Sequence, residues 1–158
     1  MTLSRALAVV ALLVGVAACD KDKEVDLPAE LVDIQPTVPV QRVWSTSVGG
    51  GGEKLRLALA LAEQDGAVFA AARNGRVRAI DAATGRTRWQ IDTKLELSAG
   101  PGVGDGLVVV GTNGGRLMAL DAASGQQRWT AQLSGEVLAT PLVADGHVVV
   151  RSVDGRLR

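Results

Sequence analysis

Residues 79–89 read Ala79-Ile80-Asp81-Ala82-Ala83-Thr84-Gly85-Arg86-Thr87-Arg88-Trp89, and residues 119–129 repeat them as Ala119-Leu120-Asp121-Ala122-Ala123-Ser124-Gly125-Gln126-Gln127-Arg128-Trp129. Asp81 and Trp89 thus return 40 residues later as Asp121 and Trp129. Glycines keep the same step, and these are Gly75, Gly115 and Gly155. Alignment of residues 68–107 with residues 108–147 gives 16 identities in 40 positions. An internal repeat of this length indicates an array of stacked supersecondary units.

Each repeat unit reads as short strands joined by turns. In the first unit, the apolar run 67–72 leads into Asn74-Gly75, a strong hairpin signal. Arg76–Ile80 alternates as a strand does, and Asp81–Gly85 predicts a turn in which the carboxylate accepts backbone N–H groups. Arg86–Ile91 is the next strand. Four strands every 40 residues predict an all-β fold, a β-propeller of four-stranded blades, with about two and a half blades in this chain.

Two further segments complete the expected strands. Leu55–Ala62 has good helix formers, but leucine recurs at every second position, which is the strand period. We therefore expect it to form the first strand of the first blade. In the third unit, we expect strands at Glu136–Val143 and Val148–Arg151, followed by a turn at Asp154-Gly155.

The apolar pattern also fits stacked blades. Val108–Val110 and Val148–Val150 are continuous apolar runs, as expected for inner strands that are covered on both faces. Ala70–Ala72 offers small residues for the crowded region near the axis. The wedge between blades widens away from the axis, where Trp89 and Trp129 are large enough to fill it.

The beginning of the chain predicts a targeting signal. Ala6–Ala18 is apolar but too short to span a bilayer as a helix, and its length suits a secretory signal peptide. It ends in Val16-Ala17-Ala18-Cys19, which resembles a bacterial lipobox. Cleavage between Ala18 and Cys19, with lipidation of Cys19, is the favoured interpretation. The alternative is an ordinary signal peptide with Ala-x-Ala-type cleavage and an incidental cysteine.

The chain therefore divides into three parts. Residues 1–18 form the signal peptide, and residues 19–42 form the lipidated N-terminus and a tether rich in charge and proline. Residues 43–158 form the partial propeller. Its units run over about 53–92, 93–132 and, truncated, 133–158.

Composition excludes several classes of function. Lys plus Arg and Asp plus Glu both total 17, and this balance argues against nucleic acid as a partner. Aromatic residues make up 3%, too few for a surface that stacks bases or sugars. One cysteine and one histidine leave little material for a metal site and none for an intramolecular disulfide.

Candidate polar residues have simpler explanations than catalysis. The recurring acids stand in turns, where we expect them to bind backbone groups, and they are Asp65, Asp81, Asp105, Asp121 and Asp145. His147 stands where the previous unit has Leu107, so we expect a packing or turn residue. The arginines of the units are expected to lie mostly on solvated strand faces. No catalytic residue, metal ligand or cofactor is predicted.

The unit at residues 79–89 resembles the quinoprotein-type propeller repeat, Ala-x-Asp-x-x-Thr-Gly-x-x-x-Trp. In that family, the tryptophan docks against the neighbouring blade and the Asp-to-Gly turn closes the outer hairpin. The resemblance thus implies structural roles for two sets of residues, Asp81, Gly85 and Trp89, and Asp121, Gly125 and Trp129. It does not by itself imply the quinone cofactor.

The lipobox, the tether and Val43–Gly49 together narrow the resemblance to the propeller lipoproteins of the outer-membrane β-barrel assembly machinery. Members have eight blades, and the strand around Val43–Val48 completes the last one, so this chain corresponds to an N-terminal fragment. The resemblance implies a non-enzymatic scaffold, lipid-anchored at the periplasmic face of the outer membrane. Implied partners are the central barrel-inserting subunit and nascent outer-membrane proteins. Asp20 leaves retention in the inner membrane as an alternative.

Two other functions share the repeat. The chain could be a fragment of a periplasmic dehydrogenase that uses pyrroloquinoline quinone and calcium, although it has no adjacent cysteine pair. It could also be a lipid-anchored propeller that binds an unrelated partner. The resemblance does not assign partner-binding residues to this stretch.

Overall fold

The computed structural model describes residues 28–33, 37–50, 54–55 and 57–158. The chain divides into two compact units, Met1–Pro39 and Val40–Arg158. In the first unit, the described residues are exposed and form neither helix nor strand. The expected signal peptide and the lipidation site at Cys19 lie outside the described residues.

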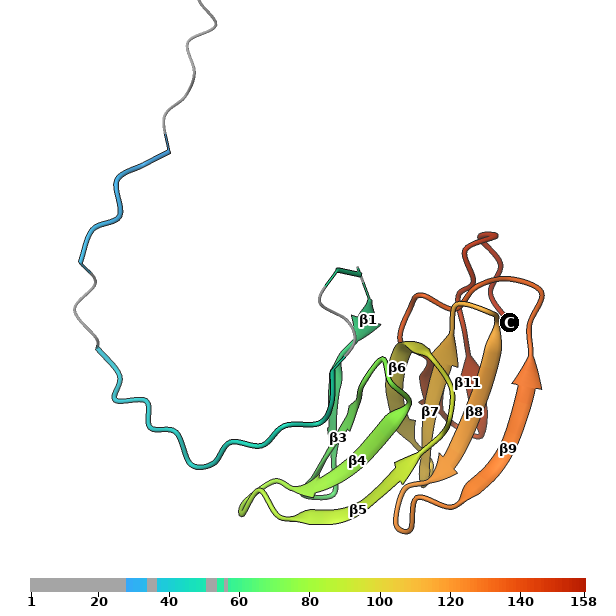
Figure 1. Cartoon of the computed structure of the whole chain (residues 1–158), viewed down its shortest axis with the longest axis horizontal. Helices are drawn as coiled ribbons and strands as arrows, with labels where there is room; N and C mark the ends of the chain where they lie inside the picture. Colours follow the sequence, from blue (N-terminus) through green and yellow to red (C-terminus); the bar gives the residue numbers. More distant parts are fainter. Residues whose placement is uncertain (1–27, 34–36, 51–53, 56) are drawn as a thin grey trace, which may run out of the picture. The chain divides into compact units, whose positions relative to one another are not determined.

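The compact unit Val40–Arg158 holds all the strands of the described residues, and the first of its sheets is a four-stranded antiparallel one. Its strands follow each other in chain order, and they are β2 (Leu61–Gln64), β3 (Ala67–Ala71), β4 (Arg76–Asp81) and β5 (Thr87–Asp92). This sheet, coloured green in Figure 1, is the first blade. A tight turn at Asp65-Gly66 joins β2 to β3, and both residues have positive φ, as a two-residue hairpin requires.

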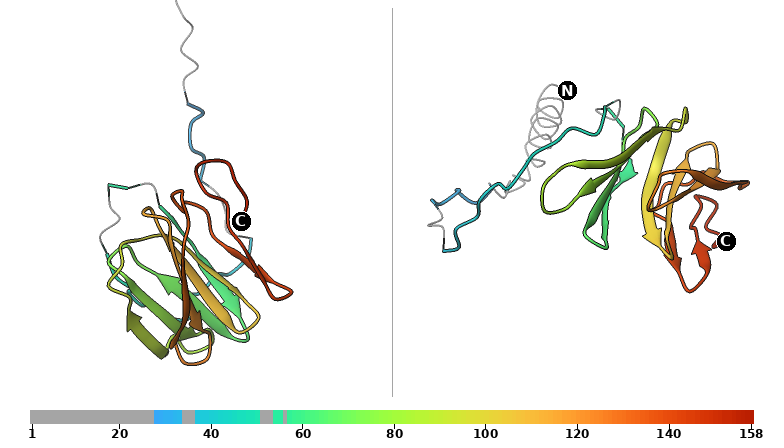
Figure 2. Two further views of the ribbon diagram at one scale, coloured as in Figure 1. Left: turned by 90° about the vertical axis from the view of Figure 1, so that its right-hand side faces the viewer. Right: turned by 90° about the horizontal axis from the view of Figure 1, so that it is seen from below.

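A second sheet repeats the same order. It contains β6 (Leu97–Gly104), β7 (Leu107–Thr112), β8 (Arg116–Asp121) and β9 (Gln127–Gln132). The two sheets lie side by side in Figures 1 and 2. The chain is all-β within its described residues, and the all-β propeller prediction is confirmed.

The strand expected at Leu55–Ala62 is divided in two. Lys54 and Leu55 lie in a turn, and β1 (Ala58–Leu59) pairs in parallel with β6 of the second sheet. The nitrogen of Ala60 donates to the oxygen of Gly100 at 3.0 Å, and β2 then begins and pairs with β3. The expectation of one continuous strand is wrong, because the two halves of the segment pair with different blades.

The third repeat unit, residues 133–158, also departs from expectation. Val137 forms only an isolated bridge with Ser152, and β10 (Leu142–Ala144) begins after Pro141. Proline has no N–H group to donate, which disfavours ladder pairing at that point. The expectation of a continuous strand at Glu136–Val143 is therefore wrong.

The rest of the third unit forms a partial sheet. β11 (His147–Val149) is shorter than expected and pairs with β10. Val150 and Arg158 exchange two backbone hydrogen bonds, of 2.8 and 3.0 Å, so the end of the chain runs antiparallel to the segment after β11. The expected turn at Asp154-Gly155 is present between these segments.

Two apolar clusters join the three repeat units, and β7 contributes to both. Val108 and Val110 pack with Phe69 and Val77 of the first blade. Val109 points the other way, into a cluster that includes Val143 of the third unit. The continuous valine run of β7 is thus explained, because both faces of this strand are covered by neighbouring blades.

Candidate functional site

The turn after β4 is organised by the side chain of Asp81. Its Oδ1 accepts hydrogen bonds from the Thr84 nitrogen at 3.0 Å and from the Thr84 hydroxyl at 2.8 Å. Its Oδ2 accepts from Arg88 Nη2 at 2.9 Å. The hydrogen bond from Arg88, followed by those from Thr84, lowers the pKa of Asp81 from 3.8 to about 2.

The turn after β8 repeats this arrangement around Asp121. Its Oδ1 accepts from the nitrogen and the hydroxyl of Ser124, each at 2.8 Å, and Arg128 Nη2 lies 2.6 Å from its Oδ2. Hydrogen bonds from Arg128 and then from Ser124 lower the pKa of Asp121 to about 2. Serine makes the same two hydrogen bonds as threonine, because the side chain contributes only its hydroxyl to the turn.

Trp89 connects the first blade to this second turn. Its indole Nε1 donates to the carbonyl oxygen of Ala122 at 2.8 Å. Its ring covers Gly125, where an added Cβ would lie 2.7 Å from Trp89 Cε3. Gly125 also has a φ of 75°, so glycine is favoured both by the backbone and by the tryptophan above it.

Trp44 makes the same junction with the first blade, which the sequence analysis did not identify. Its Nε1 donates to the oxygen of Ala82 at 2.8 Å, and an added Cβ on Gly85 would lie 2.7 Å from Trp44 Cγ. Trp44 therefore docks on the first blade in the way that Trp89 docks on the second. The repeat did not reveal this, because Trp44 precedes Trp89 by 45 residues instead of 40.

Two arginines of β4 hold the segment that follows Trp44. Arg78 donates to the Thr46 hydroxyl at 3.1 Å and to the oxygen of Ser47, and Arg76 donates to the oxygen of Val48 at 3.4 Å. Arg78 is thus an exception to the expected solvated arginines. These contacts place residues 44–48 beside the first blade, in the position of a neighbouring blade's outer strand.

Trp129 has a different environment from that of Trp89, its counterpart in the repeat. It is half-buried and packs against the cluster between the second and third units. Within the part of the chain that the structure describes, no acceptor lies within hydrogen-bond reach of its indole nitrogen. The structure thus brings together Trp89, Asp121 and Gly125, and it leaves Trp129 outside such a junction.

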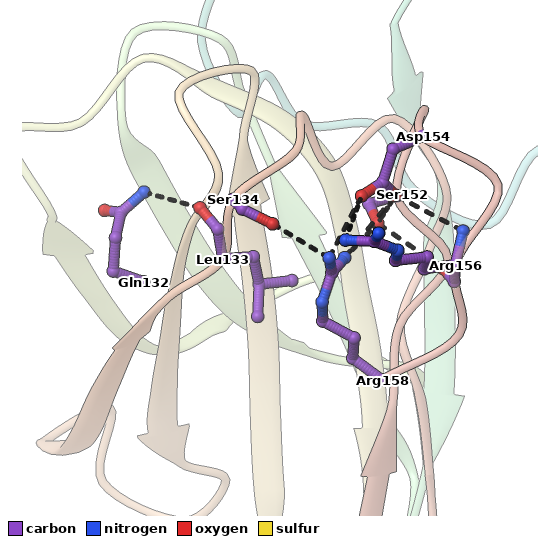
Figure 3. A network of polar contacts seen from close by, with 7 residues as sticks. All are labelled: Gln132, Leu133, Ser134, Ser152, Asp154, Arg156 and Arg158. Carbon is purple, nitrogen blue, oxygen red and sulfur yellow. Dashed lines mark hydrogen bonds and ion pairs between the residues drawn. The ribbon is translucent and has the colours of Figure 1, made fainter.

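A polar network closes the third unit (Figure 3). Arg158 Nη2 donates to Asp154 Oδ2 at 3.0 Å and to the Ser134 hydroxyl at 2.8 Å, and the Ser152 hydroxyl donates to Asp154 Oδ1 at 2.5 Å. The hydrogen bond from Arg158, then that from Ser152, holds the pKa of Asp154 far below its usual range. The network joins the last turn to the segment that follows β9.

The remaining candidates lie in hairpin turns. Asp65, Asp105 and Asp145 all take positive φ next to a glycine. Asp105 Oδ2 accepts from the Gly146 nitrogen at 2.7 Å. His147 is exposed at the start of β11, with Nδ1 2.7 Å from the oxygen of Asp145.

The described ranges 28–33, 37–50, 54–55 and 57–158 contain no group of three His, Cys, Asp or Glu side chains placed to hold a metal ion. They also contain no helix of the length and apolar character needed to cross a membrane.

Stacked four-stranded sheets, in which an outer-strand tryptophan docks on the Asp-to-Gly turn of the next sheet, define a propeller of the quinoprotein-type repeat. The family model described as outer membrane protein assembly factor BamB matches residues 73–158, which is more than half of the chain. The chain belongs to this family.

Curated relatives carry the same description. A protein of Alkalilimnicola ehrlichii named outer membrane protein assembly factor BamB is 46% identical over 98 residues, which cover 62% of this chain and 25% of the relative. A protein of the same name from Xanthomonas campestris is 41% identical over 97 residues, covering 55% of this chain and 23% of the relative. The chain spans about a quarter of the length of these relatives.

Solved structures show the same architecture. BamB from Moraxella catarrhalis matches with a TM-score of 0.58 and 31% identity, covering 63% of this chain and 30% of that protein. The computationally designed Ika8 protein matches with a TM-score of 0.55 and 23% identity, covering 61% of this chain and 30% of that one. The second match bears on the fold alone.

Proposed function

We propose that the protein is a non-enzymatic scaffold of outer-membrane protein assembly, which aids the folding and insertion of β-barrel proteins. The family match over residues 73–158 carries this proposal. The relatives are named assembly factors, which supports a structural role over catalysis.

The repeated junction suits a scaffold. Trp44 and Trp89 each make one hydrogen bond to the next turn and rest on a glycine that leaves no room for a side chain. Each turn is closed by its own aspartate, and in each an arginine neutralises the second carboxylate oxygen. We assign architectural roles to Asp81, Gly85, Trp89, Asp121 and Gly125, and the same role to Trp129 when another blade follows it. Rigid blades then present loops and rims to a partner.

The anchor and the partners form the finer part of the proposal. Cleavage after Ala18 and lipidation of Cys19 would hold the propeller at the periplasmic face of the outer membrane, with inner-membrane retention as the alternative because of Asp20. The proposed partners are the central barrel-inserting subunit and nascent outer-membrane proteins. The names of the relatives support membership of the assembly complex.

The experiment is affinity purification of the full chain from detergent-solubilised membranes of its host, followed by mass spectrometry. We expect subunits of the barrel-assembly complex to be recovered with it. A chain carrying Gly125→Ala is the control, because this change breaks a blade junction and leaves every charge in place. Recovery of the unaltered chain without any assembly subunit would overturn the proposal.

A further inference from the structure

The chain has two asparagines, and glycine follows each of them, as Asn74-Gly75 and Asn113-Gly114. The first pair lies in the turn between β3 and β4, and the second lies in the matching turn between β7 and β8. The two pairs are not equivalent within the repeat, because Asn113 stands where the first unit has Arg73. The same dipeptide therefore occupies different positions in two similar turns.

The first pair is held on both sides of its peptide bond. The Gly75 nitrogen donates to the oxygen of Ala72 at 3.0 Å, and Asn74 Oδ1 accepts from the Arg76 nitrogen at 3.3 Å. Gly75 is buried, and an added Cβ would lie 2.7 Å from the oxygen of Leu95. The side chain of Asn74 and the nitrogen that follows it are thus fixed by other bonds in a crowded place.

The second pair is free. Among the described residues, the Gly114 nitrogen has no acceptor and the Asn113 side chain has no hydrogen-bond partner. In this turn it is the Gly115 nitrogen that donates to the oxygen of Thr112, at 3.0 Å. Asn113 and Gly114 are both exposed, and a Cβ added to Gly114 would meet only the Thr112 hydroxyl, 3.8 Å away. Water solvates the amide and the nitrogen without holding them in place.

We propose that Asn113 is a site of spontaneous deamidation through a cyclic succinimide, whereas the fold protects Asn74. The Gly114 nitrogen loses its proton and attacks Asn113 Cγ, a C–N bond forms, and the bond from Cγ to Nδ2 breaks. The side-chain nitrogen leaves as ammonia, which takes up the proton. Glycine favours this step because it has no Cβ to hinder ring closure. The inference depends on the turn and not on a role in barrel assembly.

Hydrolysis then opens the ring in one of two ways. Water that adds at Cγ leaves an aspartyl residue, and water that adds at the main-chain carbonyl leaves an isoaspartyl residue, which lengthens the backbone by one methylene. Both products add a carboxylate to the surface hollow that Asn113 and Arg116 line. The isoaspartyl product also lengthens the turn that the bond between Gly115 and Thr112 closes. The site therefore alters both charge and geometry at the end of β7.

The experiment is incubation of the folded full chain in mildly alkaline buffer, followed by cleavage after lysine and mass spectrometry. Lys54 and Lys94 place the two asparagines in separate fragments, residues 55–94 and 95–158. Deamidation appears as the mass gain of an amide that becomes a carboxylate. We expect this gain to be at least tenfold faster in fragment 95–158. In guanidinium chloride, we expect similar rates in both fragments, because the turns are lost.

Two variants locate the reaction and its cause. Asn113→Gln keeps an amide but requires a larger ring, so the fast gain in fragment 95–158 should disappear. The double variant Arg73→Asn, Asn74→Gly moves the pair of the first turn to the position that it has in the second. We expect the fast gain to appear then in fragment 55–94. Tryptophan fluorescence checks that both variants keep the fold of the unaltered chain.

Three results would overturn the inference. The first is equal rates in the two fragments of the folded chain, which would mean that the bonds of Gly75 and Asn74 give no protection. The second is a gain in fragment 95–158 that persists in Asn113→Gln. The third is a folded double variant whose fragment 55–94 stays unmodified, since position in the turn would then not decide reactivity.

Discussion

The indole nitrogen of Trp89 lies 2.8 Å from the carbonyl oxygen of Ala122, and this hydrogen bond joins the outer strand of one blade to the outer turn of the next. Trp44 and Ala82 form the same pair one blade earlier, also at 2.8 Å. The repeat unit of the sequence is therefore not the unit of packing, because each tryptophan stabilises a turn that belongs to the following unit.

The two repeated tryptophans should differ in their contribution to stability. Trp89→Ala removes a docked ring and should lower the free energy of unfolding by about 3 kcal/mol. Trp129→Ala should cost clearly less, because no turn covers Trp129 in the described part of the chain. Urea unfolding of the two variants measures both values. Equal losses in the free energy of unfolding would mean that docking on the turn adds no stability beyond that of burying the ring.

The contact between Gly125 and Trp89 can be separated from backbone strain. Gly125→Ala should lower the free energy of unfolding by about 3 kcal/mol, since positive φ and a close contact at 2.7 Å both oppose the methyl group. Gly146→Ala is the control, because its φ is 71° and nothing lies within 4 Å of the added atom. We expect it to cost about 1 kcal/mol, from strain alone. Similar values would show that the ring moves aside freely.

Acid should weaken the turns that Asp81 and Asp121 close. Their pKa values are about 2 in the folded chain and 3.8 in the reference state, so both carboxylates stabilise the fold above pH 4. This contribution is lost as the pH falls from about 4 to about 2. Thermal unfolding across this range should show a falling Tm, with a shallower fall in the Asp81→Asn, Asp121→Asn double variant. Identical slopes would contradict the prediction.

Arg78 should hold the segment at residues 44–48 without being needed by the rest of the blade. Arg78→Met installs the residue type found at the equivalent position, Met118, and removes the bonds to Thr46 and Ser47. We expect faster hydrogen exchange in that segment and little change in β3 and β4. Arg86→Met, at an exposed position, should leave the exchange unaltered. Unchanged exchange in Arg78→Met would exclude this clamping role.

Lipidation of Cys19 remains a prediction from the sequence. Cys19→Ser should abolish labelling with radioactive palmitate and release the chain from membranes, since acyl chains supply the anchor. Fractionation of cells that express each form gives the second readout. Labelling that persists in the variant would refute the lipobox interpretation and favour an ordinary signal peptide.

Much of the fold could be read from the sequence because local signals agree with one another. The Asp-Gly and Asn-Gly pairs mark hairpins through their tolerance of positive φ, and Asp65 and Gly75 both adopt it. The valine run of β7 indicated a strand covered on both faces, as the two apolar clusters now explain. These features depend on few residues that are close in the chain.

Other features required the tertiary structure. The division of Leu55–Ala62 into β1 and β2 arises because each half finds a different partner strand, and a period of two cannot specify partners. Trp44 escaped detection because its junction with Gly85 depends on position in space, and its spacing breaks the repeat. A cavity of about 380 Å³, lined by Asp65 and Gly106 among others, was equally hidden, because it arises from how two hairpins face each other.

The repeat, the all-β class, the turns and the family resemblance follow from the sequence, since hairpin chemistry and apolar period are encoded within each repeat unit. Which strand halves pair and which tryptophans dock depends on how the units pack, because docking and pairing are contacts between units. Identical local signals, such as those of Trp89 and Trp129, therefore reach different environments.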